Sequence, residues 1–193
     1  LNYGELILKG KSKQEILIST YICHPSMANN ELSGPIVSTA LAKHFSTKKL
    51  NSKTLRFIFV PETIGSITYL CKNLKKLKNI IAGFNLSCIG DGRQYSYLPT
   101  KYGNTLSDKA AINAFKDLKI KFVTYSFLDR GSDERQYNSP GINLPIATIM
   151  RTKYGRYPEY HTSLDNLKFV TPAGLAGGYL AIKNAIQIIE NNK

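Results

Sequence analysis

Residues 55–66 read LRFIFVPETIGS, and this stretch decides the fold. The run over residues 55–60, apolar apart from Arg56, is typical of a strand buried on both faces, as in a parallel sheet. Apolar residues then recur at helical spacing over residues 64–77, with lysines between them. A buried strand followed at once by a helix is the repeating unit of layered α/β folds.

The same alternation of strand and helix continues in both directions along the chain. Further strands are expected at residues 15–22, 80–89, 121–126 and 144–149, and further helices at residues 33–45, 104–118 and 173–189. Residues 1–10 and 13–22 are expected to be adjacent strands at the starting edge of the sheet. No repeat or Pro/Gly/Ser linker divides the chain, so we predict one α/β domain over residues 1–193. The chain does not begin with Met, and we expect it to be a fragment or core of a longer chain.

The chain is strongly basic, with 26 Lys and Arg against 13 Asp and Glu and a net charge of +13. Such a charge favours polyanionic partners, nucleic acid among them. The lysines gather in residues 43–53 and 71–79, which hold no Arg and lack the interleaved aromatic residues of a single-strand platform. We therefore favour a solvated lysine-rich surface over a nucleic-acid site.

Composition also excludes several classes of protein. The hydrophobic content of 42% is too high for a mostly disordered chain. No apolar run approaches the ~20 residues of a membrane-spanning helix, so no membrane partner is expected. No signal peptide is visible. Three isolated cysteines, at positions 23, 71 and 88, form neither a disulfide framework nor a C-x-x-C zinc pattern, which indicates a reducing, cytoplasmic location.

Side chains capable of chemistry follow the predicted strands. His24 and Glu31 follow the first strand, Glu62 the second, Asp91 the third, and His161 lies in the long loop after the last. Ligands bind beyond the carboxyl ends of the strands in open α/β sheets, so we expect these residues to converge. A mixed set of imidazoles and carboxylates is what zinc prefers.

Each of these residues also has a purely structural explanation, which the sequence alone leaves open. The sequence His24-Pro25 fits a turn, Glu62 fits a helix N-cap, and Asp91-Gly92 is a common turn dipeptide. His161 fits a position just before a helix capped by hydroxyl groups, and residues 132–135 fit a solvated charged turn. His44 lies on the apolar stripe of its predicted helix, and we assign it a structural role.

Four segments resemble the zinc-dependent aminopeptidase superfamily of the bacterial leucyl aminopeptidase and glutaminyl cyclase type. In order, they are YICHPSMANNELSGP (21–35), FVPETIGS (59–66), RGSDERQYNSPGINLP (130–145) and EYHTSLDN (159–166). The phrases CHPS, ANNELSG, PETIGS and GSDERQY resemble more closely a bacterial branch found among surface-polysaccharide biosynthesis genes. The resemblance implies a three-layer α/β/α sandwich with a mostly parallel mixed sheet, and a chain shorter than a complete peptidase.

The resemblance also implies roles for individual residues. His24 and His161 match zinc ligands, and Glu62 matches the general base that helps a zinc-activated water to attack an amide bond. Asn30 stands where the superfamily has a carboxylate that bridges two zinc ions. We therefore expect one zinc ion rather than two, because a neutral side chain cannot offset the repulsion between two cations.

The remaining ligand positions of the superfamily are also changed. Thr63 and Ser87 stand where further carboxylate ligands are usual. Our first choice for the third zinc ligand is Glu31 and our second is Asp91. Around this set, the resemblance implies a few supporting residues. These are Asp165, expected to orient His161, and Asp133, Arg135 and Tyr160, expected in the wall of the substrate pocket.

Three functions follow from these observations. The first is a metal-dependent hydrolase of amide bonds, most simply an aminopeptidase acting on a peptide or small-molecule substrate. The second is a related acyl- or sugar-modifying enzyme in polysaccharide assembly, favoured by the altered carboxylates. The third is a catalytically inactive binding module whose basic surface contacts an acidic partner or nucleic acid. The sequence does not indicate an oligomeric state.

Overall fold

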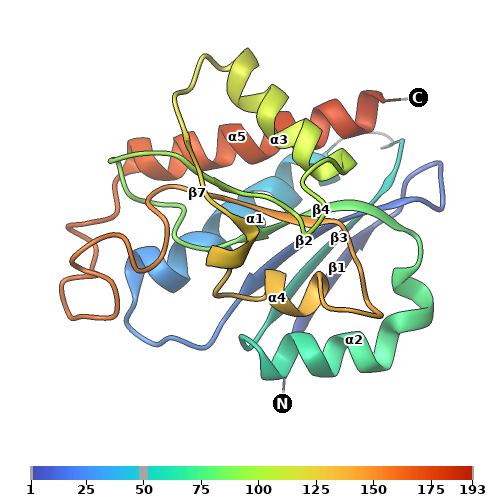
Figure 1. Cartoon of the computed structure of the whole chain (residues 1–193), viewed down its shortest axis with the longest axis horizontal. Coiled ribbons are helices and arrows are strands. Elements are labelled where there is room, and N and C mark those ends of the chain that lie inside the picture. The colour runs from blue at the N-terminus through green and yellow to red at the C-terminus, as the bar shows by residue number, and fades with distance from the viewer. Residues whose placement is uncertain (1, 48–51, 193) are drawn as a thin grey trace.

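The computed structural model describes residues 2–47 and 52–192. Within these residues, seven strands form one mixed sheet in the order β1-β3-β2-β4-β7-β5-β6 (Figure 1). The strands are β1 (Gly4–Leu8), β2 (Glu15–Tyr21), β3 (Thr54–Val60), β4 (Ile80–Leu86), β5 (Ser96–Leu98), β6 (Val123–Thr124) and β7 (Ile146–Met150). The central strand β2 runs parallel to both β3 and β4, and β7 runs parallel to β4. The expected mostly parallel mixed sheet is therefore confirmed.

Helices cover both faces of this sheet. They are α1 (Ser33–Ser46), α2 (Ile64–Leu77), α3 (Leu106–Asp117), α4 (Glu134–Tyr137) and α5 (Pro172–Asn191), with a π-helical turn η1 (Ala28–Leu32) and a 3-10 turn η2 (Phe127–Asp129). Figure 1 shows α1, α3 and α5 on one side of the strands and α2 and α4 on the other. The expected three-layer α/β/α sandwich is confirmed.

The alternation of side chains along β2 explains the two layers of core. Ile16 and Ile18 are fully buried in the cluster that packs against α1, α3 and α5. Leu17 points to the opposite face and is fully buried in a second cluster with Tyr69 of α2 and Tyr137 of α4. Because successive residues of a strand face opposite sides, a strand inside a three-layer fold is buried on both faces, and all seven residues of β2 are buried.

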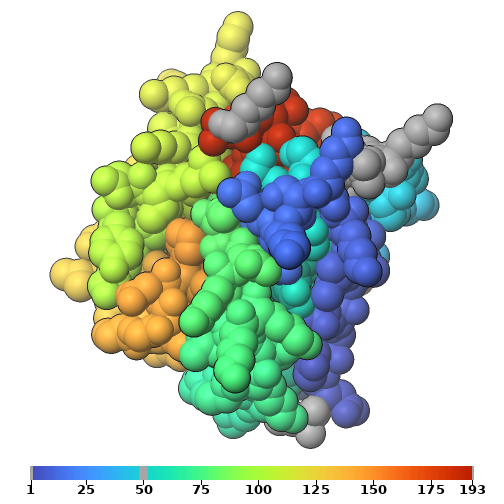
Figure 2. Space-filling view, turned by 90° about the vertical axis from the view of Figure 1, so that its right-hand side faces the viewer, coloured from blue at the N-terminus to red at the C-terminus, as the bar shows by residue number. Residues whose placement is uncertain are grey.

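One expectation about the sheet is wrong. β1 pairs antiparallel with β3 and not with β2, because both edges of β2 are already taken by β3 and β4. At the surface β1 also borders α2 (Figure 2). The ring of Tyr3, just before β1, meets the ring of Tyr69 edge to face, with 5.5 Å between the ring centroids.

The far edge of the sheet also differs from expectation. The strand expected over residues 121–126 is reduced to Val123–Thr124, and β5 was not expected. Both are too short to leave a clear alternating pattern in the sequence. No helix of the described part of the chain has the length and apolar character needed to cross a bilayer.

Candidate functional site

Four side chains from distant parts of the chain meet beyond the carboxyl ends of the strands. The ring centroids of His24 and His161 are 5.4 Å apart. His24 Nε2 lies 3.6 Å from Glu62 Oε2, and His24 Nδ1 lies 3.8 Å from Glu31 Oε2. We call His24, Glu31, Glu62 and His161 the candidate site. The convergence expected from the strand ends is therefore present for these four residues but does not include Asp91, and the fold positions it where α/β sheets bind ligands.

Glu31 owes its place to the π-helical turn that precedes α1. Asp165 accepts hydrogen bonds from the backbone N–H groups of Asn29, at 2.6 Å, and Asn30, at 3.0 Å, and so fixes the start of this turn. Glu31 Oε2 is buried without a hydrogen-bond partner among the described residues. Burial raises the pKa of Glu31, a hydrogen bond from the Cys23 backbone lowers it, and the nearby Glu62 carboxylate raises it. π-helical turns of this kind are frequent at functional sites.

Glu62 sits on a sharply bent backbone directly after β3. The next residue, Thr63, has φ 61° and ψ −70°, and the N–H of Ile64 donates to the carbonyl of Glu62 at 2.7 Å. This is a γ-turn of the rare form that strains an L-residue. The Glu62 carboxylate accepts a hydrogen bond from Ser132 Oγ to Oε1 at 2.6 Å. The Glu62 backbone N–H donates to Cys23 Sγ at 3.1 Å.

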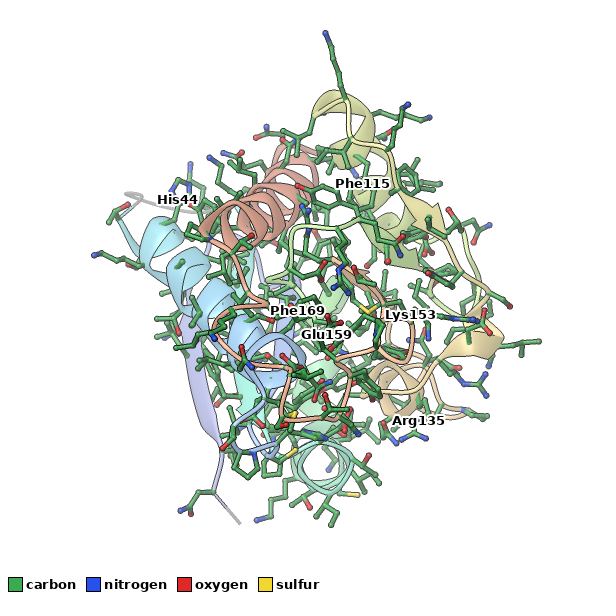
Figure 3. All side chains as sticks on the ribbon, turned by 90° about the vertical axis from the view of Figure 1, so that its left-hand side faces the viewer. His44, Phe115, Arg135, Lys153, Glu159 and Phe169 are labelled. Carbon is green, nitrogen blue, oxygen red and sulfur yellow. The ribbon has the colours of Figure 1, made fainter. Side chains whose placement is uncertain are left out.

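His161 lies in the long loop that follows β7. It has φ 56°, in the left-handed region that L-residues rarely adopt, and the ring of Tyr160 stacks on its ring at 4.0 Å. The loop is anchored by Glu159, which forms a bidentate ion pair with Arg93, and by Phe169, whose ring centroid lies 4.6 Å from the Arg93 guanidinium carbon. Figure 3 labels Glu159 and Phe169. Burial raises the pKa of Tyr160 to about 12.

The structure gives two of the expected residues other partners. Asp91 is fully buried, and both of its carboxylate oxygens accept hydrogen bonds from Thr152, at 2.7 and 2.8 Å. It thereby joins the loops that follow β4 and β7. Asp165 bonds to the π-helical turn and, at 3.4 Å, to the hydroxyl of Tyr157 rather than to His161. It therefore acts on the turn that carries Glu31.

The segment at residues 131–137 is not the solvated turn that its charges allowed. Ser132, Asp133 and Glu134 are buried, whereas Arg135 is exposed and its Nη2 lies 3.4 Å from Thr63 Oγ1. Asp133 Oδ1 accepts hydrogen bonds from the Thr63 N–H and from Ser66 Oγ, both at 2.8 Å. Burial raises the pKa of Asp133 to about 7, although these two hydrogen bonds act to lower it. The Asp133 carboxylate thus faces the γ-turn after Glu62.

Two of the changed ligand positions are occupied by neutral, buried side chains. Asn30 donates from Nδ2 to the hydroxyl of Tyr21 at 2.9 Å, and its Oδ1 has no hydrogen-bond partner among the described residues. Ser87 Oγ is likewise buried and unpaired within the same part of the chain. Sequence reasoning missed Tyr21, Cys23 and Ser132 as neighbours of the site, although all three lie in the quoted segments.

A hollow of about 290 Å³ opens beside the candidate site. It is lined by His24, Ser26, Met27, Ala28, Glu31, Leu32, Asn166 and Leu167. Across residues 2–47 and 52–192, no group of three or more His, Cys, Asp or Glu side chains is placed so as to hold a metal ion. The carboxylates face the His24 ring at distances that leave them without direct hydrogen bonds to it.

Comparison with known proteins gives one family and a set of related folds. The model of a family described as a domain of unknown function, DUF4910, matches residues 1–192. A Clostridium acetobutylicum protein is 45% identical over 194 residues, which cover 100% of this chain and 44% of that protein. It is provisionally named a polysaccharide biosynthesis protein with an aminopeptidase-like domain. The chain therefore spans less than half the length of this curated relative.

Solved structures agree with the sequence comparison. A crystal structure from Clostridium acetobutylicum, provisionally called a peptidase, matches with a TM-score of 0.95 and 43% identity, over 99% of this chain and 45% of that one. An aminopeptidase from Aneurinibacillus sp. strain AM-1 matches with a TM-score of 0.81 at 20% identity, over 95% and 47% of the chains. A zinc aminopeptidase from Bacillus subtilis matches with a TM-score of 0.82 at 18% identity, over 98% and 50%. The fold is that of the zinc aminopeptidases.

Proposed function

The chain belongs to the DUF4910 family and has an aminopeptidase-like fold, and from this premise we propose that it is a zinc-dependent hydrolase of amide bonds, most simply an aminopeptidase. One observation carries the proposal. His24 and His161 are 137 positions apart in the chain, yet their ring centroids lie 5.4 Å apart, beside the carboxylate of Glu62. The substrate is a peptide or a small molecule with an amide bond. The domain is one part of a longer protein, in line with the length of its relative.

The types of side chain at the candidate site suit a zinc ion, although those of the described residues are not placed so as to hold one in this arrangement. Two imidazoles and one carboxylate are the ligands of many catalytic zinc sites. Glu31 Oε2 is a buried carboxylate oxygen without a hydrogen bond, which is a costly arrangement unless a cation or donor partners it. We therefore propose His24, Glu31 and His161 as the zinc ligands. Asp91 is the weaker candidate, because both of its oxygens already accept hydrogen bonds.

A single ion suits this chain better than a pair. Asn30 is neutral, and its amide nitrogen is held by Tyr21, so position 30 supplies no anionic bridge between two cations. The unpaired Asn30 Oδ1 and Ser87 Oγ are neutral acceptors where the superfamily pattern has carboxylates.

Each residue of the candidate site has its own role in the proposed hydrolysis. A zinc ion held by His24, Glu31 and His161 would supply Lewis acidity at the scissile carbonyl. Glu62 takes a proton from the attacking water and passes it to the leaving amine, as a general base and then a general acid. Tyr160 holds the His161 ring by stacking, and Asp165 holds the turn that carries Glu31. The exposed guanidinium of Arg135 is available for a substrate carboxylate.

A second candidate function is a related enzyme that modifies an acyl or sugar group during polysaccharide assembly. Two observations favour it: the provisional name of the Clostridium acetobutylicum relative, and the neutral side chains in place of carboxylates at the site. We place either enzyme in the reducing cytoplasm, in keeping with three free cysteines.

Metal content and turnover together test the proposal. Zinc is expected to bind to the wild type and to be lost in His24→Ala, but to be retained in His44→Ala, a control at the far end of α1 (Figure 3). Glu62→Gln is expected to lower kcat on aminoacyl anilides by about 10²- to 10⁴-fold with zinc retained. Turnover of acetylated or amidated sugars instead would select the second function. If the wild type binds substoichiometric zinc, and His24→Ala binds the same amount, the proposed metal site is contradicted.

A further inference from the structure

The segment at residues 131–137, distant from Glu62 in the chain, contacts the Glu62 carboxylate through Ser132. The Glu62 side chain is partly open, with 22% of its surface exposed, whereas Ser132 is only 2% exposed. Ser132 Oγ donates to Glu62 Oε1 at 2.6 Å, across a separation of 70 residues. A hydrogen bond to an ionised carboxylate is short and stronger than one between neutral groups. A partly exposed carboxylate on a flexible side chain thus accepts a hydrogen bond from a buried hydroxyl.

The next residue of the same segment holds the backbone under Glu62. Asp133 Oδ1 accepts the N–H of Thr63, the central residue of the strained γ-turn, and also the hydroxyl of Ser66. A backbone conformation of this kind costs about 1–3 kcal/mol and persists only where its surroundings enforce it. Ser132 therefore holds the side chain of Glu62, and Asp133, the next residue, holds the backbone that follows it.

The segment is itself anchored to the sheet. Glu134 is fully buried, and its Oε1 accepts the N–H groups of Gly131, at 2.8 Å, and Ser132, at 2.9 Å, as well as the hydroxyl of Tyr154, at 2.7 Å. Its Oε2 accepts Asn85 Nδ2 of β4 at 3.1 Å. The Ser132 hydroxyl is therefore presented from a rigid support rather than from a free loop.

We propose that Ser132 is the positioning residue for Glu62: by occupying Oε1, it leaves Oε2 as the oxygen that handles the proton. Oε2 is the oxygen that faces His24, with 3.6 Å between it and Nε2. Asp133 supports the same arrangement through the backbone. This inference rests on the proposed function, because that function makes Glu62 the base.

Kinetics of matched serine variants test the assignment. Ser132→Ala is expected to lower kcat by about 10- to 100-fold, the effect of losing one hydrogen bond to a charged group, with KM changed far less. Ser132→Thr retains the hydroxyl and is expected to keep more of the kcat than Ser132→Ala. Ser139→Ala is the control, because Ser139 lies just beyond this segment and donates to the Gln136 carbonyl at 2.7 Å. Equal kcat in Ser132→Ala and Ser139→Ala would overturn the proposal.

A second measurement does not depend on turnover. In crystals of Ser132→Ala, the Glu62 side chain is expected to occupy more than one rotamer, whereas it is expected to keep one in Ser139→Ala and in the wild type. A single unchanged Glu62 rotamer in Ser132→Ala would overturn the positioning role. If the wild type cleaves no amide substrate, the proposed function fails, and the rotamers of Glu62 still decide whether Ser132 positions it.

Discussion

The two ends of β2 and β3 both carry charged side chains that are buried at least in part, but only one end pairs them closely. At the amino ends, Arg56 donates to Glu15 at 2.6 and 3.1 Å and to Glu5 at 2.6 Å. We call these three residues the amino-end cluster. Arg56 and Glu15 are also well buried, with 5% and 10% of their side chains exposed. Every contact in this cluster is a direct hydrogen bond.

At the carboxyl ends, the same strands deliver charges that do not pair closely. His24 lies 3.6 Å from Glu62 and 3.8 Å from Glu31, and a buried oxygen of Glu31 has no hydrogen bond within the described residues. Cavity size does not distinguish the two ends, because the hollow beside the amino-end cluster, about 370 Å³, is larger than that of about 290 Å³ beside the candidate site.

The difference separates polar groups that serve the fold from those that the proposed function assigns to ligand binding. Native proteins hydrogen-bond nearly all their buried polar groups, so an unpaired carboxylate marks a place where stability has been given up. The amino-end cluster fulfils this rule and the candidate site breaks it. Four predictions would break or sharpen the comparison.

The largest effect is expected at the amino-end cluster. Arg56→Ala should lower the free energy of unfolding by about 3–5 kcal/mol, because it leaves the buried Glu15 and the neighbouring Glu5 without a counter-charge. Urea denaturation measures this loss. Replacing all three residues together, as Glu5→Gln, Glu15→Gln and Arg56→Met, should recover most of it. A loss below about 1 kcal/mol for Arg56→Ala would show that the cluster behaves like an exposed ion pair.

The second prediction concerns the pH dependence of stability set by Asp133. Its folded pKa, about 7, lies above the ~3.9 of an unfolded Asp. The stabilisation from its bound proton is therefore complete below pH ~4 and is lost as the pH rises towards 7. Asp133→Asn cannot ionise, so its unfolding free energy relative to wild type should rise by about 2–4 kcal/mol between pH 4.5 and pH 8.

Urea titrations of zinc-free protein at both pH values measure the Asp133 effect. Asp117→Asn, at the exposed end of α3, is the control and should show no such rise. If the difference in unfolding free energy between Asp133→Asn and the wild type is the same at both pH values, burial does not raise the pKa of Asp133.

The third prediction compares the same substitution at the two ends of β2. Without zinc, Glu15→Gln should destabilise the protein by about 1 kcal/mol or more, because a charged hydrogen bond to Arg56 is weakened. Glu31→Gln should stabilise it by up to about 1 kcal/mol, because it removes a partly buried negative charge that lies near Glu62 and whose Oε2 has no hydrogen-bond partner among the described residues. Thermal unfolding of the zinc-free variants reports both signs. Destabilisation by Glu31→Gln of the same size would erase the distinction between the two ends.

The smallest effect is expected on the surface of the loop that carries His161. Arg93 pairs with Glu159 through two hydrogen bonds, but the Arg93 side chain is 48% exposed. Arg93→Ala should therefore lower the unfolding free energy by about 1 kcal/mol or less, and less again in high salt. A loss comparable to that of Arg56→Ala would mean that this loop is as essential to the fold as the amino-end cluster.

Much of the fold was predictable because it depends on local pattern. The apolar run at residues 55–60 and the helical spacing at 64–77 correspond to β3 and α2, with the helix bounds reproduced. The pairing of β1 was not predictable in this way. Strand order depends on which edges are free after the central strands have paired, and no local pattern records that.

By itself, the sequence determined the layered α/β fold and the kinds of side chain that follow each strand, because burial and periodicity are properties of neighbouring residues. Only the tertiary structure decided which of those side chains meet. It brought Glu31 to His24 through a π-helical turn, enclosed Asp91 in hydrogen bonds, and set Ser132 against Glu62. These outcomes rest on contacts between residues that lie far apart in the chain or on the bend of a single turn, and both take shape only when the sheet has assembled.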